Sequence, residues 1–401
     1  MIYLDHAAAT PVHPAALKAM LPYFTEQFFN PSAPYLPAKH IREAYESAKN
    51  TIARYIGAKG TDLVITAGAT ESINLAFTVL QSYPNSRCLT LTTEHAAVLE
   101  VAKAHSRDLI AVHHDGLIDL DDLVQKLNDD VVLVSVSLAN NELGTIQPLA
   151  DIAALIQKTR QARLEREITT PLFLHSDASQ ALSLLDLNVA RLGVDLLTLN
   201  AAKCGGPKGI GALYLAHGVP VQPLSLGGGQ ERGLRSGTEN VPSVIGFATA
   251  ITEAKDHLSG SRKKYTKMAQ LLRQALKNLP ETIFLGNLKH QLVSFVPVCF
   301  PGLDAERLIY KLEADDIFVS TGAACAANKG AKSHVLAAIG LSDEEIAGSL
   351  RISLGLTNTE EQITIAAQKI VEVVQSEYAR ISQHTHSIQG SNHAFQGGTN
   401  V

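Results

Sequence analysis

The chain has 401 residues, of which 46% are hydrophobic and 18% charged, and this favours a globular protein of two or three structural units. A net charge of −5, the lack of a Lys/Arg stripe and an aromatic content of 5% argue against direct nucleic-acid binding. No apolar segment reaches the roughly 18 residues of a membrane span. The N-terminus lacks a signal-peptide pattern, so we expect a cytoplasmic protein that does not enter the membrane.

Between about residues 60 and 250, short apolar runs alternate with segments of helical spacing. The apolar runs predict strands at 62–66, 88–92, 131–138, 172–175 and 196–199. The helical spacing predicts helices at 72–80, 96–106 and 151–167. Strands that are apolar throughout, separated by helices, predict an α/β fold with a doubly wound, mostly parallel sheet.

Past about residue 255, the pattern of predicted secondary structure changes to a mixture of helices and strands. We therefore expect a large α/β domain at 13–255 and a smaller α+β domain built from 1–12 and 256–380. Residues 381–401 are rich in Ser, His, Gln, Gly and Asn and have little to bury, which predicts a flexible tail.

The four cysteines, Cys88, Cys204, Cys299 and Cys325, are far apart and form no C-x-x-C pair. This spacing argues against a disulfide framework or a structural zinc site, and we expect no metal. Cys88 and Cys299 lie in apolar runs, as inert packing cysteines do. Cys325 does not, because its neighbours are small and polar.

Polar residues follow each predicted strand at the point where it ends. They are Gly68–Ser72, Glu94 with His95, Asn140–Glu142, Asp177–Gln180 and Lys203. The carboxyl ends of strands in a doubly wound sheet meet at one crevice, where ligands bind. Each group alone could be an ordinary turn, but five together predict a ligand site.

The residue types in this crevice indicate a particular cofactor. Free amides where a helix opens after Gly68, with the Thr70 hydroxyl, would hold a phosphate, although a simple N-cap is the alternative. Neither a Walker loop nor a G-x-G-x-x-G turn occurs, so nucleotide binding has little support. A buried Asp177 needs a partner such as a protonated ring nitrogen, and a buried Lys203 is a good imine former. With His95 stacking, or else serving as a core histidine, these groups describe a pyridoxal 5′-phosphate (PLP) site.

From about Tyr3 to Gly355 the chain resembles the cysteine desulfurases of the class V aminotransferase family, in the NifS/IscS-like group I of fold type I PLP enzymes. The matching motifs are Tyr3-Leu-Asp-His-Ala-Ala-Ala-Thr-Pro-Val, Phe29-Asn-Pro-Ser, Thr66-Ala-Gly-Ala-Thr-Glu-Ser, Thr93-Glu-His-Ala-Ala-Val-Leu, Asn140-Asn-Glu-Leu-Gly, His175-Ser-Asp-Ala-Ser-Gln and Gly228-Gly-Gln-Glu-Arg-Gly-Leu-Arg-Ser-Gly-Thr. Many motifs in the same order are far more specific than any one of them.

The resemblance implies a full set of cofactor-binding residues: Lys203, Ala69, Thr70, His95, Asp177, Gln180, Asn200 and Thr238. In this set Lys203 forms the internal aldimine, Asp177 pairs with the pyridine nitrogen and Gln180 bonds the ring hydroxyl. His95 stacks on the ring. Thr238 reaches the phosphate of a neighbouring subunit, which implies a homodimer with shared sites.

The resemblance also implies the substrate and the reaction. Asn141 and Arg351 would hold the carboxylate of L-cysteine. Lys203 would remove the Cα proton, and His95 would move the thiol proton. Cys325, in a loop similar to the family's S-S-G-S-A-C-T, would attack the substrate sulfur, keep it as a persulfide and leave L-alanine. The sulfur would pass to an acceptor or iron–sulfur scaffold protein, for cluster assembly or tRNA thiolation.

Two departures from the family pattern leave alternatives open. The family's S-G-H-K is Asn200-Ala-Ala-Lys here, so Ala202 supplies no side-chain donor to the phosphate. The family's histidine shortly after N-P-S, near residue 36, is missing. The alternatives are another class V enzyme, such as an aminotransferase or selenocysteine lyase, and a weakly active PLP-binding scaffold in a sulfur-transfer assembly.

Overall fold

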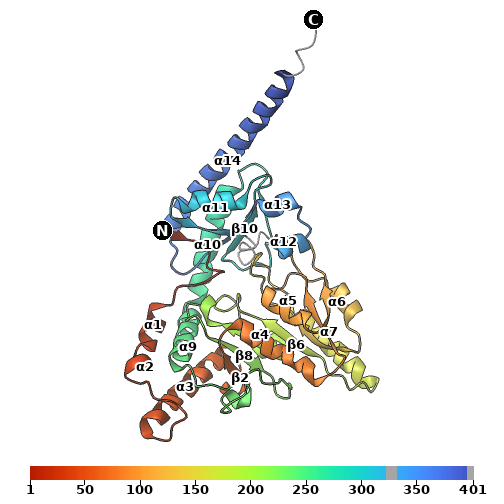
Figure 1. Cartoon of the computed structure of the whole chain (residues 1–401), viewed down its shortest axis with the longest axis vertical. Helices are drawn as coiled ribbons and strands as arrows, with labels where there is room; N and C mark the ends of the chain where they lie inside the picture. The colour runs from red at the N-terminus through yellow and green to blue at the C-terminus, as the bar shows by residue number, and fades with distance from the viewer. Residues whose placement is uncertain (322–331, 395–401) are drawn as a thin grey trace. The chain divides into compact units, whose positions relative to one another are not determined.

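The computed structural model describes residues 1–321 and 332–394, which divide into two compact units (Figure 1). Unit 1 comprises Met1–Asp5, Lys264–Leu285 and the described residues from Val293 onward. Unit 2 comprises His6–Lys263 and Gly286–Leu292. No described helix combines the length and apolarity that a membrane span requires.

Unit 2 is built on a seven-stranded sheet in the order β2-β8-β7-β6-β5-β3-β4. Its strands are β2 (Leu63–Thr66), β3 (Arg87–Leu91), β4 (Ser106–Ile110), β5 (Val131–Ser135), β6 (Phe173–Asp177), β7 (Leu196–Asn200) and β8 (Gly211–Leu215). All run parallel except β8, which is antiparallel to both of its neighbours. The predicted α/β class with a mostly parallel sheet is confirmed.

The helices of unit 2 pack around this sheet (Figure 1). They are α1 (Pro14–Met20), α2 (Pro22–Thr25), α3 (Leu36–Tyr55), α4 (Ala69–Phe77), α5 (Ala96–Lys103), α6 (Leu120–Lys126), α7 (Leu149–Glu165), α8 (Val189–Leu192) and α9 (Val241–Asp256). Helix α10 (Leu258–Leu276) contains the boundary between the two units. Every residue of β5 is buried, as a parallel strand covered on both faces requires.

A buried histidine ties together three central strands of this sheet. His175 on β6 has no exposed surface, and its two ring nitrogens lie 2.8 Å from Ser135 Oγ and 2.9 Å from Thr198 Oγ1. Burial lowers the pKa of His175 to about 3, so the ring is neutral. Its role is to satisfy hydroxyl groups inside the sheet.

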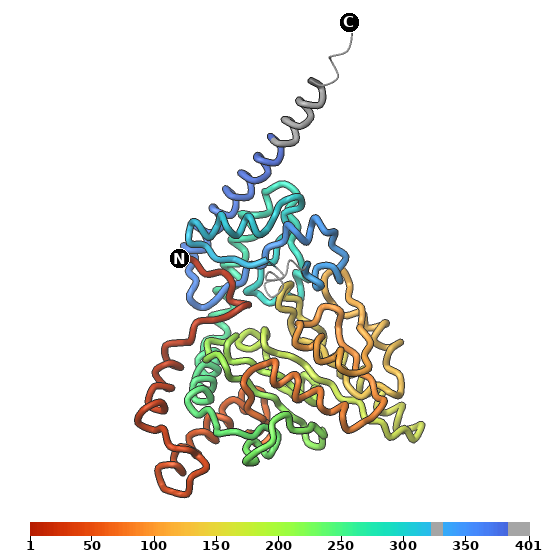
Figure 2. Tube along the Cα trace, in the orientation of Figure 1, coloured from red at the N-terminus to blue at the C-terminus, as the bar shows by residue number. Residues whose placement is uncertain are grey.

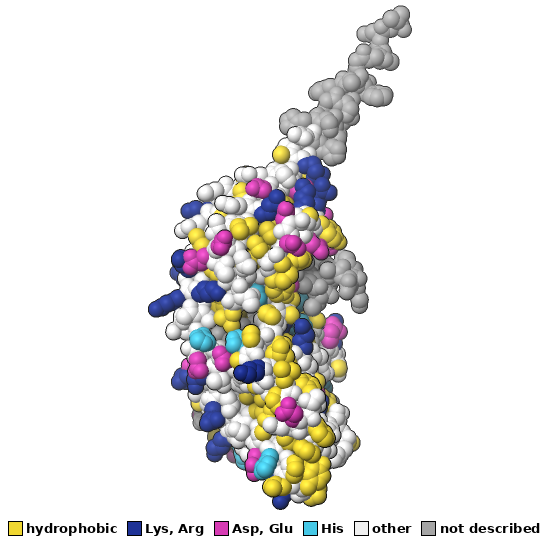
Figure 3. All heavy atoms as spheres, turned by 90° about the vertical axis from the view of Figure 1, so that its left-hand side faces the viewer, with side chains coloured by type: hydrophobic (Ala, Val, Ile, Leu, Met, Phe, Trp, Pro, Cys, Tyr) yellow, Lys and Arg dark blue, Asp and Glu magenta, His cyan; other side chains and the backbone are white. Residues whose placement is uncertain are grey.

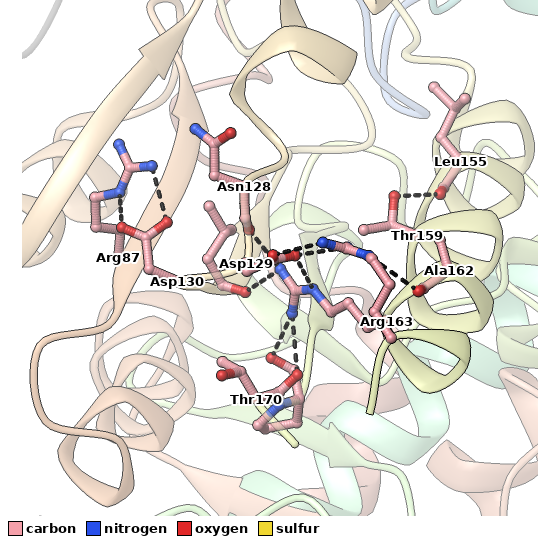
Figure 4. Close-up of polar contacts among 12 residues, drawn as sticks. Arg87, Asn128, Asp129, Asp130, Leu155, Thr159, Ala162, Arg163 and Thr170 are labelled. Carbon is pink, nitrogen blue, oxygen red and sulfur yellow. Dashed lines mark hydrogen bonds and ion pairs between the residues drawn. The ribbon is translucent and has the colours of Figure 1, made fainter. Parts of the chain in front are cut away.

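Arg163, near the end of α7, is the largest fully buried side chain among the described residues. Its guanidinium donates to four carbonyl oxygens, at 2.6–3.1 Å, belonging to Asn128, Val131, Thr170 and Pro171 (Figure 4). These carbonyls lie at or just before the starts of β5 and β6. One arginine therefore fastens the starts of two central strands to one helix.

Unit 1 has a two-stranded and a four-stranded sheet, the latter in the order β12-β13-β10-β9. Its elements are β1 (Ile2–Tyr3), β9 (Ile283–Phe284), β10 (Phe295–Cys299), α11 (Ala305–Glu313), β11 (Ile317–Phe318), β12 (Ser320–Thr321), α12 (His334–Ala338), α13 (Asp343–Ala347), β13 (Ser349–Ser353) and α14 (Glu360–Ala394). Strand β1 pairs in parallel with β11, so the first residues of the chain lie beside Ile317–Phe318, a segment far away in the sequence (Figure 2).

An ion cluster joins α11 to α14 within unit 1. The carboxylate of Glu377 is almost fully buried and binds Arg307, Lys311 and Arg380. Burial alone raises the pKa of Glu377, but hydrogen bonds from the three cations lower it to about 2. Glu377 is therefore ionised at neutral pH.

The observed boundaries differ from the expected ones. Residues 256–263 and Gly286–Leu292 were expected in the smaller domain but belong to unit 2. Residues 6–12 belong to unit 2, because Thr10 and His13 hydrogen-bond backbone groups next to Lys203. Helix α14 continues to Ala394, where a flexible tail was expected from 381.

Candidate active site

Lys203 lies directly beyond the carboxyl end of β7, in a short 3₁₀ turn over Ala201–Lys203. The strand before it is buried and apolar, which fixes the base of the turn. Asn200 caps the turn, since its Oδ1 accepts from the Ala202 backbone N–H at 3.3 Å. The half-buried Lys203 amine donates to the carbonyl oxygens of Ala7 at 2.7 Å and Ala8 at 2.6 Å.

The N-terminal segment of unit 2 holds the other side of this turn. Thr10 donates from its backbone N–H and its hydroxyl to the Ala202 carbonyl, at 3.1 and 3.0 Å. The Thr10 hydroxyl also accepts from the Gly205 N–H at 2.9 Å. The residues on both sides of Lys203 are thus fixed by one threonine, and this holds the lysine backbone in place.

Gln180 lies beside Lys203, because both side chains bind the same atom. Gln180 Nε2 donates to the Ala7 carbonyl oxygen at 3.0 Å, and Lys203 Nζ donates to that oxygen too. The sheet neighbours β6 and β7 carry these two residues beyond their ends. Two of the predicted site residues are therefore brought together.

Asp177, the last residue of β6, is the acidic group of the site. Its Oδ1 accepts both hydrogen bonds from Ser179, at 2.9 Å from the N–H and 2.6 Å from the hydroxyl. Burial raises the pKa of Asp177, while the Ser179 bonds and the positive charges of His95 and Lys203 oppose the rise. Oδ2 has no hydrogen bond from the described part of the chain, which suits it to a cationic partner.

His95 caps α5 and is within electrostatic reach of Asp177. Its Nδ1 accepts from the Ala97 N–H at 3.1 Å, so in the neutral ring the proton is on Nε2. The cap fixes the ring at the end of β3, two strands from Asp177 in the sheet order. Asp177 therefore interacts electrostatically with both His95 and Lys203.

The start of α4 is the place where the sequence predicts a phosphate site. Gly68 precedes it with φ of 145°, a conformation that favours glycine, and the first-turn amides of Ala69 and Thr70 have no acceptor inside the helix. Thr66 and Asn200 both pair with Gly211 on β8. A Cβ at Gly211 would lie 2.8 Å from Gly68 Cα, so the turns after β2 and β7 meet there. Ala69, Thr70 and Asn200 are thereby at one edge.

The remaining predicted residues lie on other segments of the chain. Asn141 lies in a turn braced by Asn140, whose Oδ1 accepts from the Glu142 and Leu143 amides, each at 2.8 Å. Thr238 is exposed in the segment before α9. Arg351 is buried on β13 of unit 1 and pairs with Asp5 at 2.6 Å. Cys325 lies outside the described residues.

Sequence reasoning missed the main-chain acceptors of Ala7 and Ala8 and the acid Glu94. A carbonyl carries no side-chain signal, and only the alanine-rich stretch before Thr10 marks the place. Glu94 stood beside His95 but had no assigned role. It is almost fully buried, and both of its oxygens bind Ser137.

Comparison with known proteins gives consistent matches over most of the chain. The family model described as Aminotransferase class-V matches residues 2–365. The chain is 36% identical over 383 residues to a protein named cysteine desulfurase IscS from Methanosarcina thermophila, covering 93% of this chain and 92% of that one. It is 36% identical over 395 residues to the cysteine desulfurase IscS of Pasteurella multocida, covering 95% and 94%.

Solved structures show the same likeness. A protein titled NifS-like protein aligns with a TM-score of 0.86 and 33% identity, covering 93% of this chain and 99% of that chain. A NifS-like protein from Rickettsia africae aligns with a TM-score of 0.83 and 28% identity, covering 94% and 99%.

Proposed function

The chain belongs to the aminotransferase class-V family, and from this premise we propose that it is a PLP-dependent cysteine desulfurase. The fold type I architecture agrees with that of the NifS-like structures. The observation that carries the proposal is the gathering of Lys203, Asp177, Gln180 and His95 at the carboxyl ends of β7, β6 and β3.

The residues present fit PLP, which when bound supplies an electron sink for the bond that breaks at Cα. Asp177 has a carboxylate oxygen suited to the protonated pyridine nitrogen. Gln180 would bond the ring hydroxyl, and His95 would lie against the ring face. The phosphate would be held at the start of α4 and beside Asn200. Lys203 would hold the cofactor's aldehyde carbon.

The proposed reaction converts L-cysteine and the Cys325 thiol into L-alanine and a Cys325 persulfide. A sulfur–sulfur bond forms between Cys325 and the substrate, and the substrate's carbon–sulfur bond breaks. Lys203 takes the Cα proton and returns it. His95, whose Nε2 carries the proton in the neutral ring, would give that proton to the substrate and take up the proton of the Cys325 thiol. Asn141 and Arg351 bind the substrate carboxylate.

We further propose a homodimer in which Thr238 reaches the partner's phosphate. Apolar side chains gather on the face over the first helices (Figure 3). Five of them are exposed by 49–65%: Leu17, Leu21, Phe24, Phe28 and Leu36. A contiguous apolar surface of this kind suits a second copy of the chain.

The product sulfur is proposed to pass to an acceptor protein in the cytoplasm, for iron–sulfur cluster assembly or tRNA thiolation. The described cysteines, Cys88, Cys204 and Cys299, are unpaired thiols, as is usual in a reducing compartment.

The test is to incubate the PLP-loaded protein with L-cysteine and dithiothreitol and to quantify sulfide and alanine. Equimolar sulfide and alanine are expected. Amino-group transfer to a keto acid without sulfide would instead identify an aminotransferase, and turnover confined to selenocysteine would identify a selenocysteine lyase. Bound cofactor with no turnover would identify a scaffold.

The replacement of a histidine by Ala202 predicts weak cofactor retention. Ala202→His should restore a donor beside the phosphate and lower the PLP dissociation constant by roughly 10-fold. Equilibrium dialysis followed by absorbance measures this. Ala202→Phe is the matched control, since it adds similar bulk without a donor. Equal dissociation constants for wild type and Ala202→His would show that other groups compensate.

A further inference from the structure

Glu94 is a buried acid beside the site that the proposed reaction does not use. It immediately precedes His95, and only 1% of its surface is exposed. Its Oε1 accepts from the Ser137 backbone N–H at 2.7 Å, and its Oε2 bonds the Ser137 hydroxyl. Ser137 lies just beyond β5, so this side chain joins the turn after β3 to the end of the neighbouring strand.

Two more hydrogen bonds continue this link across the sheet edge. Asn140 Nδ2 donates to the Thr93 carbonyl oxygen at 2.9 Å. The Leu138 N–H donates to the Asp177 carbonyl oxygen at 2.9 Å. The turn that carries His95 is thus connected through the end of β5 to the residue that ends β6. The side chains of Glu94 and Asn140 both contribute to that connection.

We propose that Glu94 is a positioning residue, which fixes the His95 turn relative to Asp177 through its hydrogen bonds to Ser137. The inference rests on the proposed function, because His95 and Asp177 are the residues it positions. Glu94 acts through His95 and has no contact of its own with the substrate in this role.

The protonation of Glu94 supports this role. Burial raises the pKa of Glu94 to about 8, the bonds from Ser137 oppose the rise, and the nearby Asp177 carboxylate adds to it. At neutral pH the carboxyl therefore carries a proton for much of the time. Glutamine, which is neutral and has the same shape, should therefore fulfil the positioning role of Glu94, whereas alanine should not.

The experiment compares Glu94→Ala, Glu94→Gln and Ser137→Ala with wild type, all loaded with PLP to equal occupancy. The circular dichroism of the cofactor band reports the ring's asymmetric surroundings, and is recorded before any substrate is added. Glu94→Ala should lose most of this signal and show a kcat lower by roughly 10- to 100-fold, with a smaller change in KM. Glu94→Gln should keep both, and Ser137→Ala should be intermediate.

Glu100→Ala, an exposed change on α5, is the control and should match wild type. An unchanged spectrum and kcat in Glu94→Ala, or a Glu94→Gln variant as impaired as Glu94→Ala, would overturn the proposal. If Glu94→Ala does not fold, Ser137→Ala still tests the proposal. A role limited to stability would leave the cofactor spectrum of Ser137→Ala unchanged, whereas a positioning role would alter it.

A second measurement separates this inference from the function itself. Absence of a cofactor band in wild type would count against the proposed function. Hydrogen exchange at the Ala97 amide, which donates to His95 Nδ1, can be followed in cofactor-free protein. Faster exchange in Glu94→Ala but not in Glu94→Gln supports the positioning role, and equal rates contradict it.

Discussion

Replacing Lys203 with alanine is expected to lower the turnover of L-cysteine by roughly 10²- to 10⁴-fold or more, the range for losing a general base. The lysine lies at the end of a buried strand, and its amine is directed by the carbonyls of Ala7 and Ala8. No other described lysine is joined to Asp177 electrostatically in this way. The fold should persist, since Thr10 holds the turn through backbone groups.

Sulfide release by the PLP-loaded variant, with its circular dichroism in the far ultraviolet, measures this prediction. Lys203→Arg should be equally inactive, because a guanidinium stays protonated and cannot serve as the base. Lys208→Ala is the matched control, since Lys208 is exposed five residues further along and should not affect turnover. A Lys203→Ala variant within a few-fold of wild type would remove Lys203 from the mechanism.

Replacing Arg163 with methionine should lower the free energy of unfolding by about 3 to 5 kcal/mol. The change leaves four carbonyl oxygens without their charged donor at the starts of β5 and β6. Burial lowers the pKa of Arg163, and the negative charge of Asp129 opposes this shift. Arg163→Lys should recover only part of the loss, because one ammonium cannot reach four acceptors.

Urea unfolding midpoints and hydrogen exchange at β5 and β6 amides measure the effect of Arg163. Arg166→Met is the control at the end of the same helix: Arg166 is half exposed and pairs with Asp129 at 2.7 Å, so its loss should cost far less than the loss of Arg163. Equal midpoints for the two variants would show that the buried arginine is not needed to hold the strands.

The sheet could be predicted where strands are buried on both faces. The segments ending at Thr66, Asp177 and Asn200 are apolar almost throughout, and the structure has strands there. Strand β4 was missed because it is an edge strand of which only Ile110 is fully buried. Its sequence, Ser-Arg-Asp-Leu-Ile, therefore lacks the apolar run of the central strands.

The site could be predicted from the sequence for those residues whose side chains are unusual at the end of an apolar strand. Lys203, Asp177 and His95 were found because charged or aromatic groups after apolar runs are unusual. The contribution of Ala7 was not predictable, since a main-chain carbonyl gives no signal. The position of residues 6–12 was missed for a similar reason: backbone bonds through Thr10, not an apolar pattern, place them in unit 2.

The most direct test of the proposed activity is sulfide and alanine production from L-cysteine by Cys325→Ala beside Cys204→Ala. Burial raises the pKa of the Cys204 thiol to about 12, so it is not expected to act as a nucleophile. We predict that Cys204→Ala keeps turnover and that Cys325→Ala loses it while still binding PLP. Equal sulfide from wild type and Cys325→Ala would contradict the persulfide mechanism.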